Sequence, residues 1–219
     1  MPKRITYLDK RDRLSREDFR LHWSTTHAEI ARDLPGVTAY RQNHVVPLPV
    51  LPASDDAYPV DGIVELWFDD EDVVQAAFDS DIADRLAADE LRFLSGLTGG
   101  AVSPAQPYEV WPHKLWLLAR WSGGTDSGPE AVDGWAERLA ETCAGALGVS
   151  VNYLRADAEL LTRKALRSDP HLPQIAVALG FASATTAAAA AARIAEGLDP
   201  LPGVLDRVHG YLAEEVVII

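Results

Sequence analysis

Two hydrophobic periods alternate along the first half of the chain. Apolar positions at every second residue, or runs rich in β-branched and aromatic residues, predict β-strands at 3–9, 37–46, 61–68 and 108–111. Apolar positions three and four residues apart predict amphipathic helices at 15–33 and 82–94. This half is therefore expected to run strand, helix, strand, strand, helix, strand.

Local signals support these boundaries. Ser15 lies three residues before Asp18, as in a capping box at the start of a helix, and Pro35-Gly36 ends that helix. Residues 46–59 hold four prolines, too many for the interior of a sheet. We interpret this stretch as a long loop, which either covers a cavity or simply connects two strands.

The second half repeats the order of elements. Its expected strands are 114–121, 150–155, 175–181 and 210–219, and its expected helices are 129–147 and 185–196. The join at Pro112-His113 divides the chain into residues 1–112 and 113–219. Each βαββαβ unit forms an antiparallel sheet with both helices on one face, and the bare face has to be covered. We therefore predict an α+β fold, with two tandem ferredoxin-like units packed sheet to sheet as a pseudo-dimeric α+β barrel.

Polar side chains on two neighbouring strands suggest a site. Strict alternation puts Tyr40, Gln42 and His44 on one face of the second strand. On the third strand, Glu65 and Trp67 lie opposite the apolar face that suits the helices. We expect both sets to line one cavity between the sheets, with His44 as general base or acid, Tyr40 as a proton donor or oxyanion partner and Glu65 as the orienting carboxylate. The alternative is that His44 and Glu65 form a buried hydrogen-bonded pair that only holds the sheets together.

Each predicted helix of the first half carries a polar residue within its apolar face. His27 shares a stripe with Phe19 and Trp23, and Asp89 lies on the corresponding stripe of the next helix. Because burial of a lone carboxylate is costly, we predict a His27–Asp89 pair with a mainly structural role. His22 lies about 140° from His27 around a regular α-helix, so no metal site is expected.

Composition and charge narrow the classes of function. The chain has 219 residues, of which 47% are hydrophobic and 24% charged, as in an ordinary globular protein. A net charge of −13 without a basic stripe argues against a nucleic-acid partner. No apolar run approaches the roughly 18 residues that a membrane span needs. One cysteine, Cys143, and an N-terminus without a hydrophobic signal segment suggest a cytoplasmic protein without disulfides.

Four sequence blocks resemble the EthD family and occur in that family's order. They are L-S-R-E-D-F-R-L-H-W-S-T-T-H at 14–27, L-P-G-V-T-A-Y-R-Q-N-H at 34–44, D-G-I-V-E-L-W-F-D-D at 61–70 and A-D-E-L-R-F-L at 88–94. The resemblance covers about residues 3–112. The family pattern falls on His22, Trp23, His27, Tyr40, Gln42, Asn43, His44, Glu65, Trp67, Phe68, Asp89, Glu90 and Phe93.

The resemblance implies the dimeric α+β barrel superfamily, in which ferredoxin-like units pair sheet to sheet. Similar barrels include cofactor-free monooxygenases, polyketide and lactone cyclases or isomerases, dehydratases and decarboxylases. The second half of this chain has no H-W-x-x-x-H block. We therefore expect one functional cavity, in the first half, with the second half replacing the partner subunit of the usual homodimer.

The resulting prediction is a cofactor-independent lyase, isomerase or cyclase acting on a small hydrophobic, oxygenated substrate, aromatic or polyketide-like. Gln42 and Asn43 are expected to hydrogen-bond substrate oxygens, although alternation points Asn43 away from the cavity. The remaining candidates for substrate binding are Trp67, His22, His27 and Asp89. The alternatives are a cofactor-free monooxygenase, a haem-bound variant, and a non-catalytic ligand-binding or redox-accessory protein. The chain is expected to be a monomer with an intramolecular pseudo-dimer or a homodimer.

Overall fold

The structure is a computed structural model that describes residues 1–47, 55–105, 109–124, 128–197 and 201–219. The elements of the first half are β1 (Lys3–Lys10), α1 (Arg16–His22), the π-helix η1 (Trp23–His27), α2 (Ala28–Ala31), β2 (Val37–Val45), β3 (Gly62–Phe68), α3 (Glu71–Phe78), α4 (Asp81–Phe93) and β4 (Leu94–Ser103). Those of the second half are β5 (His113–Trp121), the 3₁₀ turn η2 (Ser122–Gly124), α5 (Pro129–Thr142), β6 (Ala146–Leu154), β7 (Ile175–Phe181), α6 (Ala184–Gly197) and β8 (Leu205–Val217).

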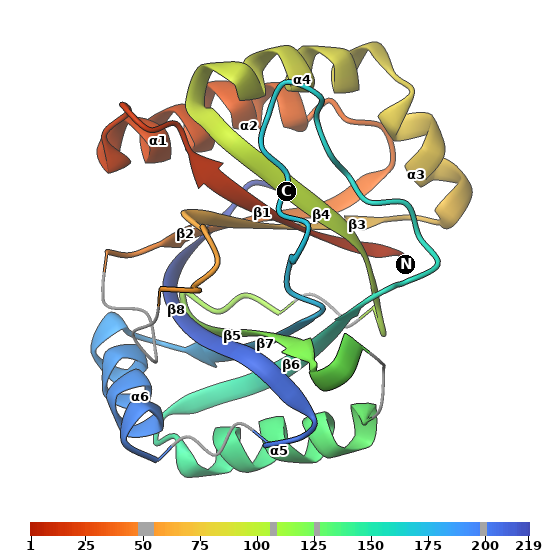
Figure 1. Cartoon of the computed structure of the whole chain (residues 1–219). Coiled ribbons are helices and arrows are strands. Elements are labelled where there is room, and N and C mark those ends of the chain that lie inside the picture. Colours follow the sequence, from red (N-terminus) through yellow and green to blue (C-terminus); the bar gives the residue numbers. More distant parts are fainter. Residues whose placement is uncertain (48–54, 106–108, 125–127, 198–200) are drawn as a thin grey trace.

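The strands of the described residues close into one barrel. Its order is β1-β3-β2-β8-β5-β7-β6-β4, and every pairing is antiparallel. Each half contributes four adjacent strands. The helices of the first half cover one outer side of the barrel, and α5 and α6 cover the opposite side (Figure 1). The predicted fold, two ferredoxin-like units packed sheet to sheet as a pseudo-dimeric α+β barrel, is confirmed, and the predicted boundary falls immediately before β5.

The two seams between the halves differ in length. At one seam β2 pairs with β8 over residues 41–45 and 213–217. At the other seam β4 pairs with β6 only through Val102↔Leu154 and Ser103↔Tyr153. The rest of the β4 edge is covered by the connection between β6 and β7, residues 155–174, which we call the strap.

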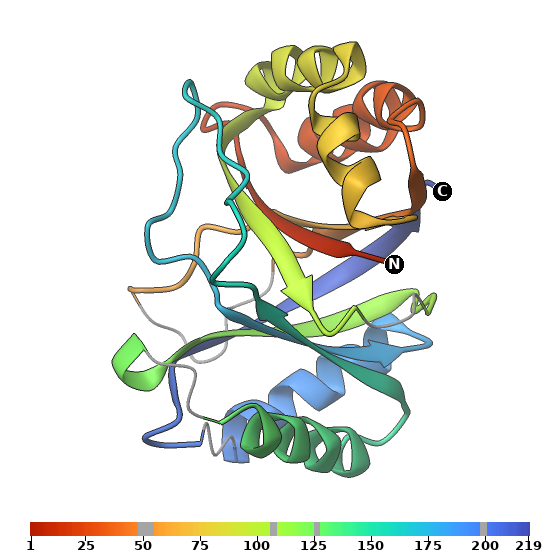
Figure 2. The same ribbon diagram turned by 90° about the vertical axis from the view of Figure 1, so that its right-hand side faces the viewer.

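The strap runs up the side of the first half (Figure 2, teal to light blue). Its Leu161 exchanges backbone hydrogen bonds with Gly99 at 2.8 and 3.1 Å, and the Arg167 carbonyl accepts from the Leu97 N–H at 2.9 Å. The unpaired donors and acceptors of an exposed sheet edge are therefore satisfied by a segment of the other half.

The barrel interior holds a buried cluster of opposite charges. The Glu65 carboxylate lies 2.8 Å from Lys3 Nζ and 2.6 Å from Lys114 Nζ, and Lys114 also pairs with Glu215. Each of these side chains is at most 3% exposed. Asn152 accepts a hydrogen bond from Lys3 Nζ at 2.8 Å. Aromatic and aliphatic side chains fill the space around the cluster, among them Ile5, Ile63, Trp116 and Leu118. The middle of the barrel is therefore a packed ionic core.

The expected strand at 108–111 is wrong. Residues 109–111 form no strand, 106–108 lie outside the described residues, and the last strand of the unit is β4. The segment L-S-G-L-T-G-G-A-V-S lacks a strand pattern because glycines replace its side chains. A Cβ at Gly99 would lie 2.4 Å from the carbonyl oxygen of Ile5, so the close approach of β1 requires glycine there. Helix α3, capped by Asp70, was also not expected.

We predict that Glu65→Gln lowers the free energy of unfolding by about 3–5 kcal/mol at pH 7, because it leaves two buried lysines short of one countercharge. The control is Glu71→Gln, which removes a solvent-exposed carboxylate paired with Arg155 and should change stability little. Urea denaturation measures both. If both substitutions lowered the free energy of unfolding by the same small amount, the buried ion pairs of Glu65 would contribute no more to stability than a surface ion pair.

The same substitution is expected to alter the pH dependence of stability. Burial alone would raise the pKa of Glu65, but the charges of Lys114 and Lys3 outweigh it and hold the pKa well below the ordinary 4.5. A carboxyl with a lowered pKa in the folded state stabilises the fold above its unfolded pKa, and this stabilisation is lost as the pH falls. Urea denaturation at several pH values between 7 and 3 should therefore show a smaller decrease in the free energy of unfolding for Glu65→Gln than for the unaltered protein.

Candidate functional site

The H-W-x-x-x-H block forms a π-helix rather than a continuous α-helix. Trp23–His27 is a π-helical turn between α1 and α2. The hydroxyls of Ser24 and Thr25 donate to the carbonyls of Arg20 and Leu21 at 2.7 and 2.6 Å, and so satisfy acceptors near the irregular turn. A π-turn closes over five residues, so residues i and i+5 share a face. The expected angle of about 140° between the two histidines is therefore wrong.

Both histidines of the block bind one carboxylate of α4. His27 Nδ1 lies 3.0 Å from Asp89 Oδ2, and His22 Nε2 lies 3.0 Å from each Asp89 oxygen. Burial alone would raise the pKa of Asp89, but the hydrogen bonds from His27 and His22 outweigh burial and lower the pKa below its ordinary value. The side chain is therefore a charged carboxylate at neutral pH. The predicted His27–Asp89 pair is present, and His22 completes it. Within the described ranges, no three His, Cys, Asp or Glu side chains are arranged as a metal site.

Three polar residues of β2, Tyr40, Gln42 and His44, face the helices and not the barrel interior. The Tyr40 hydroxyl accepts hydrogen bonds from Trp23 Nε1 at 3.1 Å and Gln42 Nε2 at 2.9 Å. Gln42 Nε2 also donates to the Trp23 carbonyl, so Gln42 Oε1 is left to accept from His44 Nε2 at 3.0 Å. In contrast, Asn43 donates to Glu65 at 3.0 Å inside the barrel.

The predicted common cavity is therefore wrong. Tyr40, Gln42 and His44 lie on one side of the sheet, while Glu65 and Trp67 lie on the other. Lys3 Nζ lies 4.6 Å from the Trp67 ring, which places that ring beside the ionic core. The alternation of β2 gave no guide, because helices cover one face and the second sheet covers the other, so polar residues are buried on both.

His44 is buried against Trp23, with ring centroids 4.4 Å apart. Burial and the nearby charge of Arg20 lower the pKa of His44 to about 3. Its Nδ1 has no hydrogen-bond partner among the described residues. A neutral imidazole that is so hard to protonate is a poor general base at neutral pH, and His44 lines none of the pockets described below.

A pocket of about 60 Å³ lies between the sheet and the helices of the first half, and we call it the helix-side pocket. Tyr40 and His27 line it together with Glu90 and two strap residues, Leu161 and Arg163. Its other walls are Thr6, Leu8, Ala31, Leu34, Val64, Leu66, Phe78, Leu86, Phe93, Leu94 and Leu97. It is therefore an apolar pocket with a few polar groups, which is the usual composition of a small-molecule site.

An ion pair closes this pocket from the second half. Arg163 Nε and Nη2 donate to the Glu90 carboxylate at 2.7 and 3.2 Å, a bidentate pair that fixes the strap against α4. Leu161 is held by its backbone pairing with Gly99. No pattern in the sequence pointed to Leu161 or Arg163, because they are distant in sequence and carry no motif. Glu90 belongs to the family pattern but was not among the predicted site residues.

Fold and site together define an α+β barrel protein with a small pocket between one sheet and its helices. Residues 11–96 match the model of the EthD domain. Residues 11–96 therefore carry the EthD domain that the four sequence blocks predicted, and the whole chain has the fold of a dimeric α+β barrel. A comparison with curated proteins gave no match.

Solved structures with the same fold include proteins with both halves in one chain. An anthrone oxidase-like protein is 8% identical with a TM-score of 0.60, over 99% of this chain and 93% of that chain. A provisionally assigned monooxygenase from Lactobacillus acidophilus NCFM is 12% identical with a TM-score of 0.54, over 100% and 94% of the two chains. A provisionally assigned chlorite dismutase, TA0507, is 10% identical with a TM-score of 0.54, over 99% and 95%. At these identities the likeness concerns the fold. No helix among the described residues is long and apolar enough to cross a membrane.

The histidine pair gives a direct prediction for Asp89→Asn. Loss of the charged acceptor should lower the free energy of unfolding by about 1.5–3 kcal/mol and release the proton that is fixed on His27 Nδ1. Nitrogen-15 NMR should show the Nδ1–H tautomer of His27 in the unaltered protein and a mixture in the variant. The control is Asp84→Asn on the exposed face of the same helix, which should change neither. A His27 proton on Nε2 in the unaltered protein would contradict the assignment.

Proposed function

We propose that the first half is a cofactor-independent acid–base enzyme, in which His27 removes a proton from a carbon beside a carbonyl group of a small apolar substrate. The Tyr40 hydroxyl donates a hydrogen bond to the oxygen on which negative charge then develops. One observation carries the proposal: a carboxylate-held histidine and a doubly hydrogen-bonded tyrosine line the same apolar pocket.

His27 has the environment of a general base. Its Nδ1 donates to Asp89, which leaves Nε2 as the acceptor nitrogen of the neutral ring. The Asp89 carboxylate also stabilises the imidazolium that forms when Nε2 takes a proton. His22 shares the same carboxylate and keeps it in place. His22 and Asp89 therefore act as positioning residues, while His27 is the group that meets the substrate.

Tyr40 is arranged to donate. Its oxygen already accepts two hydrogen bonds, from Trp23 and Gln42, and no acceptor for its proton is present among the described residues. Burial raises the pKa of Tyr40, so the hydroxyl remains protonated at neutral pH. Two incoming hydrogen bonds favour negative charge on the oxygen and so strengthen its O–H as a donor. Tyr40 lines the apolar pocket, where a hydrogen-bond donor can stabilise an enolate oxygen without competition from bulk water.

The pocket limits the substrate. Leu8, Leu34, Leu86 and Phe93 select apolar groups. A free volume of about 60 Å³ corresponds to about two water molecules. A larger substrate therefore has to displace Leu161 and Arg163 of the strap. The substrate class that fits is a small hydrophobic ketone or ester that enters by moving the strap.

The carbanion formed by proton removal leads to several outcomes. Reprotonation at another carbon completes an isomerisation, and loss of a β-substituent completes an elimination, which is the reaction of a lyase. Attack on a second carbonyl group of the same molecule completes a cyclisation. Addition of molecular oxygen to the same anion gives a hydroperoxide, and loss of water from it leaves one oxygen atom in the product, which is monooxygenation without a cofactor. Monooxygenase activity, without further detail, is provisionally assigned to one of the proteins that share the fold. Oxygen uptake that matches substrate consumption would favour this second candidate over the first.

The proton-abstraction step can be tested without the natural substrate. We predict that the protein accelerates hydrogen–deuterium exchange beside the carbonyl of small ketones, with 2-butanone as the first probe, measured by NMR in D₂O. His27→Gln should reduce this exchange by at least about 100-fold, and Tyr40→Phe should also reduce it.

The matched control is His44→Gln, which removes the other buried histidine of this half. It should destabilise the fold yet retain the exchange rate of the folded protein, because His44 does not line the pocket. Loss of exchange in His44→Gln but not in His27→Gln would overturn the assignment. Binding of the ketone without exchange would indicate a non-catalytic binding protein.

A further inference from the structure

A larger cavity lies at one mouth of the barrel, and we call it the mouth pocket. Its volume is about 280 Å³. It opens where β1 and β4 of the first half meet residues 58–60 and strap residues 167–173. It shares only the side chain of Leu97 with the helix-side pocket. None of the residues assigned to proton transfer lines it.

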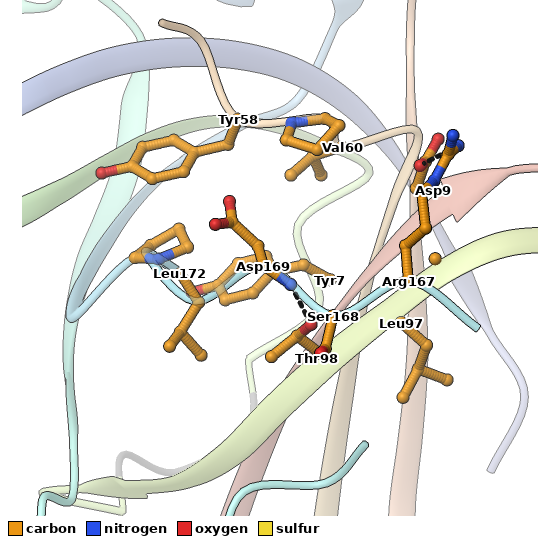
Figure 3. Close-up of a pocket in the computed structure, with 13 residues that line it drawn as sticks. Tyr7, Asp9, Tyr58, Val60, Leu97, Thr98, Arg167, Ser168, Asp169 and Leu172 are labelled. Atoms are coloured by element: carbon orange, nitrogen blue, oxygen red, sulfur yellow. Dashed lines mark hydrogen bonds and ion pairs between the residues drawn. The ribbon is translucent and has the colours of Figure 1, made fainter. Parts of the chain in front are cut away.

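Two tyrosines form opposite walls of the mouth pocket (Figure 3). Tyr7 extends from β1 inside the barrel, and Tyr58 comes from the segment before β3. The hydroxyl of Tyr58 is buried and has no hydrogen-bond partner among the residues that the structure describes. A buried hydroxyl without a partner is costly, which indicates that a further group binds beside it. Leu97 and Leu172 complete the apolar part of the walls.

Asp169 brings a carboxylate between these walls. Its backbone N–H donates to Thr98 Oγ1 at 2.9 Å, and its Oδ1 accepts from the His171 N–H at 2.7 Å. These bonds fix the side chain so that the carboxylate lies in the space between the two tyrosines (Figure 3). Its second oxygen remains available to a ligand.

The charged side chains that line the mouth pocket are two carboxylates, Asp9 and Asp169, and one cation, Arg167. At the rim, Arg167 is shared by Asp9 at 2.7 Å and Asp12 at 3.2 Å, so its charge is already balanced. Burial raises the pKa of Asp9 above its ordinary value despite the pair with Arg167, and the charges of Asp61 and Asp12 add to the rise.

Other cations near this site are engaged. Arg207 lies 4.2 Å from the Tyr58 ring and donates to the carbonyls of Asp56 and His171. Arg120 donates to the carbonyl of Leu172. These bonds go to backbone carbonyls, and among the described residues no basic side chain forms an ion pair with the Asp169 carboxylate, which leaves it open to a bound cation.

We propose that the mouth pocket is a second ligand site, which binds a single-ring organic ammonium ion. The ring would lie between Tyr7 and Tyr58, and the ammonium would donate to Asp169 and the Tyr58 hydroxyl. A volume of about 280 Å³ exceeds the roughly 150 Å³ cavity that takes benzene and lies near the lower end of ligand pockets. Aromatic faces and a carboxylate together favour a cation over a neutral or anionic ring.

Calorimetric titration with three rings of similar size tests the proposal. Benzylamine should bind more tightly than benzyl alcohol, and benzoate should not bind. Asp169→Asn should weaken benzylamine binding by about tenfold or more while leaving benzyl alcohol nearly unchanged. The matched control is Asp157→Asn, an exposed carboxylate of the same strap, which should have no effect. His27→Gln, which alters the helix-side pocket, should also leave benzylamine binding unchanged.

Each of three results would overturn the proposal. The first is equal binding of benzoate and benzylamine, and the second is no binding of any probe at millimolar concentration. The third is an equal effect of Asp157→Asn and Asp169→Asn. If circular dichroism shows that Asp169→Asn does not fold, Tyr58→Phe serves instead, because it keeps the aromatic wall and removes only the unpartnered hydroxyl. It should weaken benzylamine several-fold, and unchanged affinity in that variant would equally reject the site. Loss of ketone exchange in the helix-side pocket would not bear on these results.

Discussion

The two halves of this barrel depend on a charge balance at its centre. Lys3 of β1 and Lys114 of β5 occupy corresponding strands of the two units, and both bind the carboxylate of Glu65. At the position that corresponds to Glu65 the second unit has Ala178: Ile5 pairs with Glu65 across β1 and β3, whereas Trp116 pairs with Ala178 across β5 and β7. The second unit instead provides Glu215 of β8, which also pairs with Lys114. Glu65 bridges a lysine from each half, so closure of the barrel joins two lysines and two carboxylates in one buried network.

The sequence was informative where a segment carries its own pattern. Ser15 caps α1 and accepts from the Asp18 N–H, as the capping-box spacing indicated. The tandem ferredoxin-like order followed from alternating periods, and β3 was oriented correctly because Val64, Leu66 and Phe68 mark the helix-covered face. Prediction was wrong where packing overrides local pattern. Gly99 and Gly100 interrupt the alternating pattern of β4, so that strand was not predicted. Strand β2 is buried on both faces, so its polar residues did not indicate which face lines a pocket.

The candidate site likewise combines features that the sequence predicted with features that only the packing determines. The nine predicted site residues lie in two groups on opposite sides of one sheet, and His44, in the group on the helix side, packs against Trp23. Two physical features account for the difference between the expected and the observed arrangement of these residues. A π-turn at Trp23–His27 brings His22 and His27 to the same carboxylate. In addition, the pocket wall formed by Leu161 and Arg163 comes from the other half, which no local signal in the first half could reveal.

The strap also bears on why a fused chain differs from a pair of identical subunits. In a symmetric dimer each connection would lie over the neighbouring unit, so any change to one would be copied at the other. Here the link between β6 and β7 can lengthen, shorten or change residue by residue without altering its counterpart between β2 and β3. One wall of the helix-side pocket can thus vary by substitutions in a segment outside residues 11–96, which match the EthD domain. With both halves in one chain, this wall can change independently of the rest of the pocket.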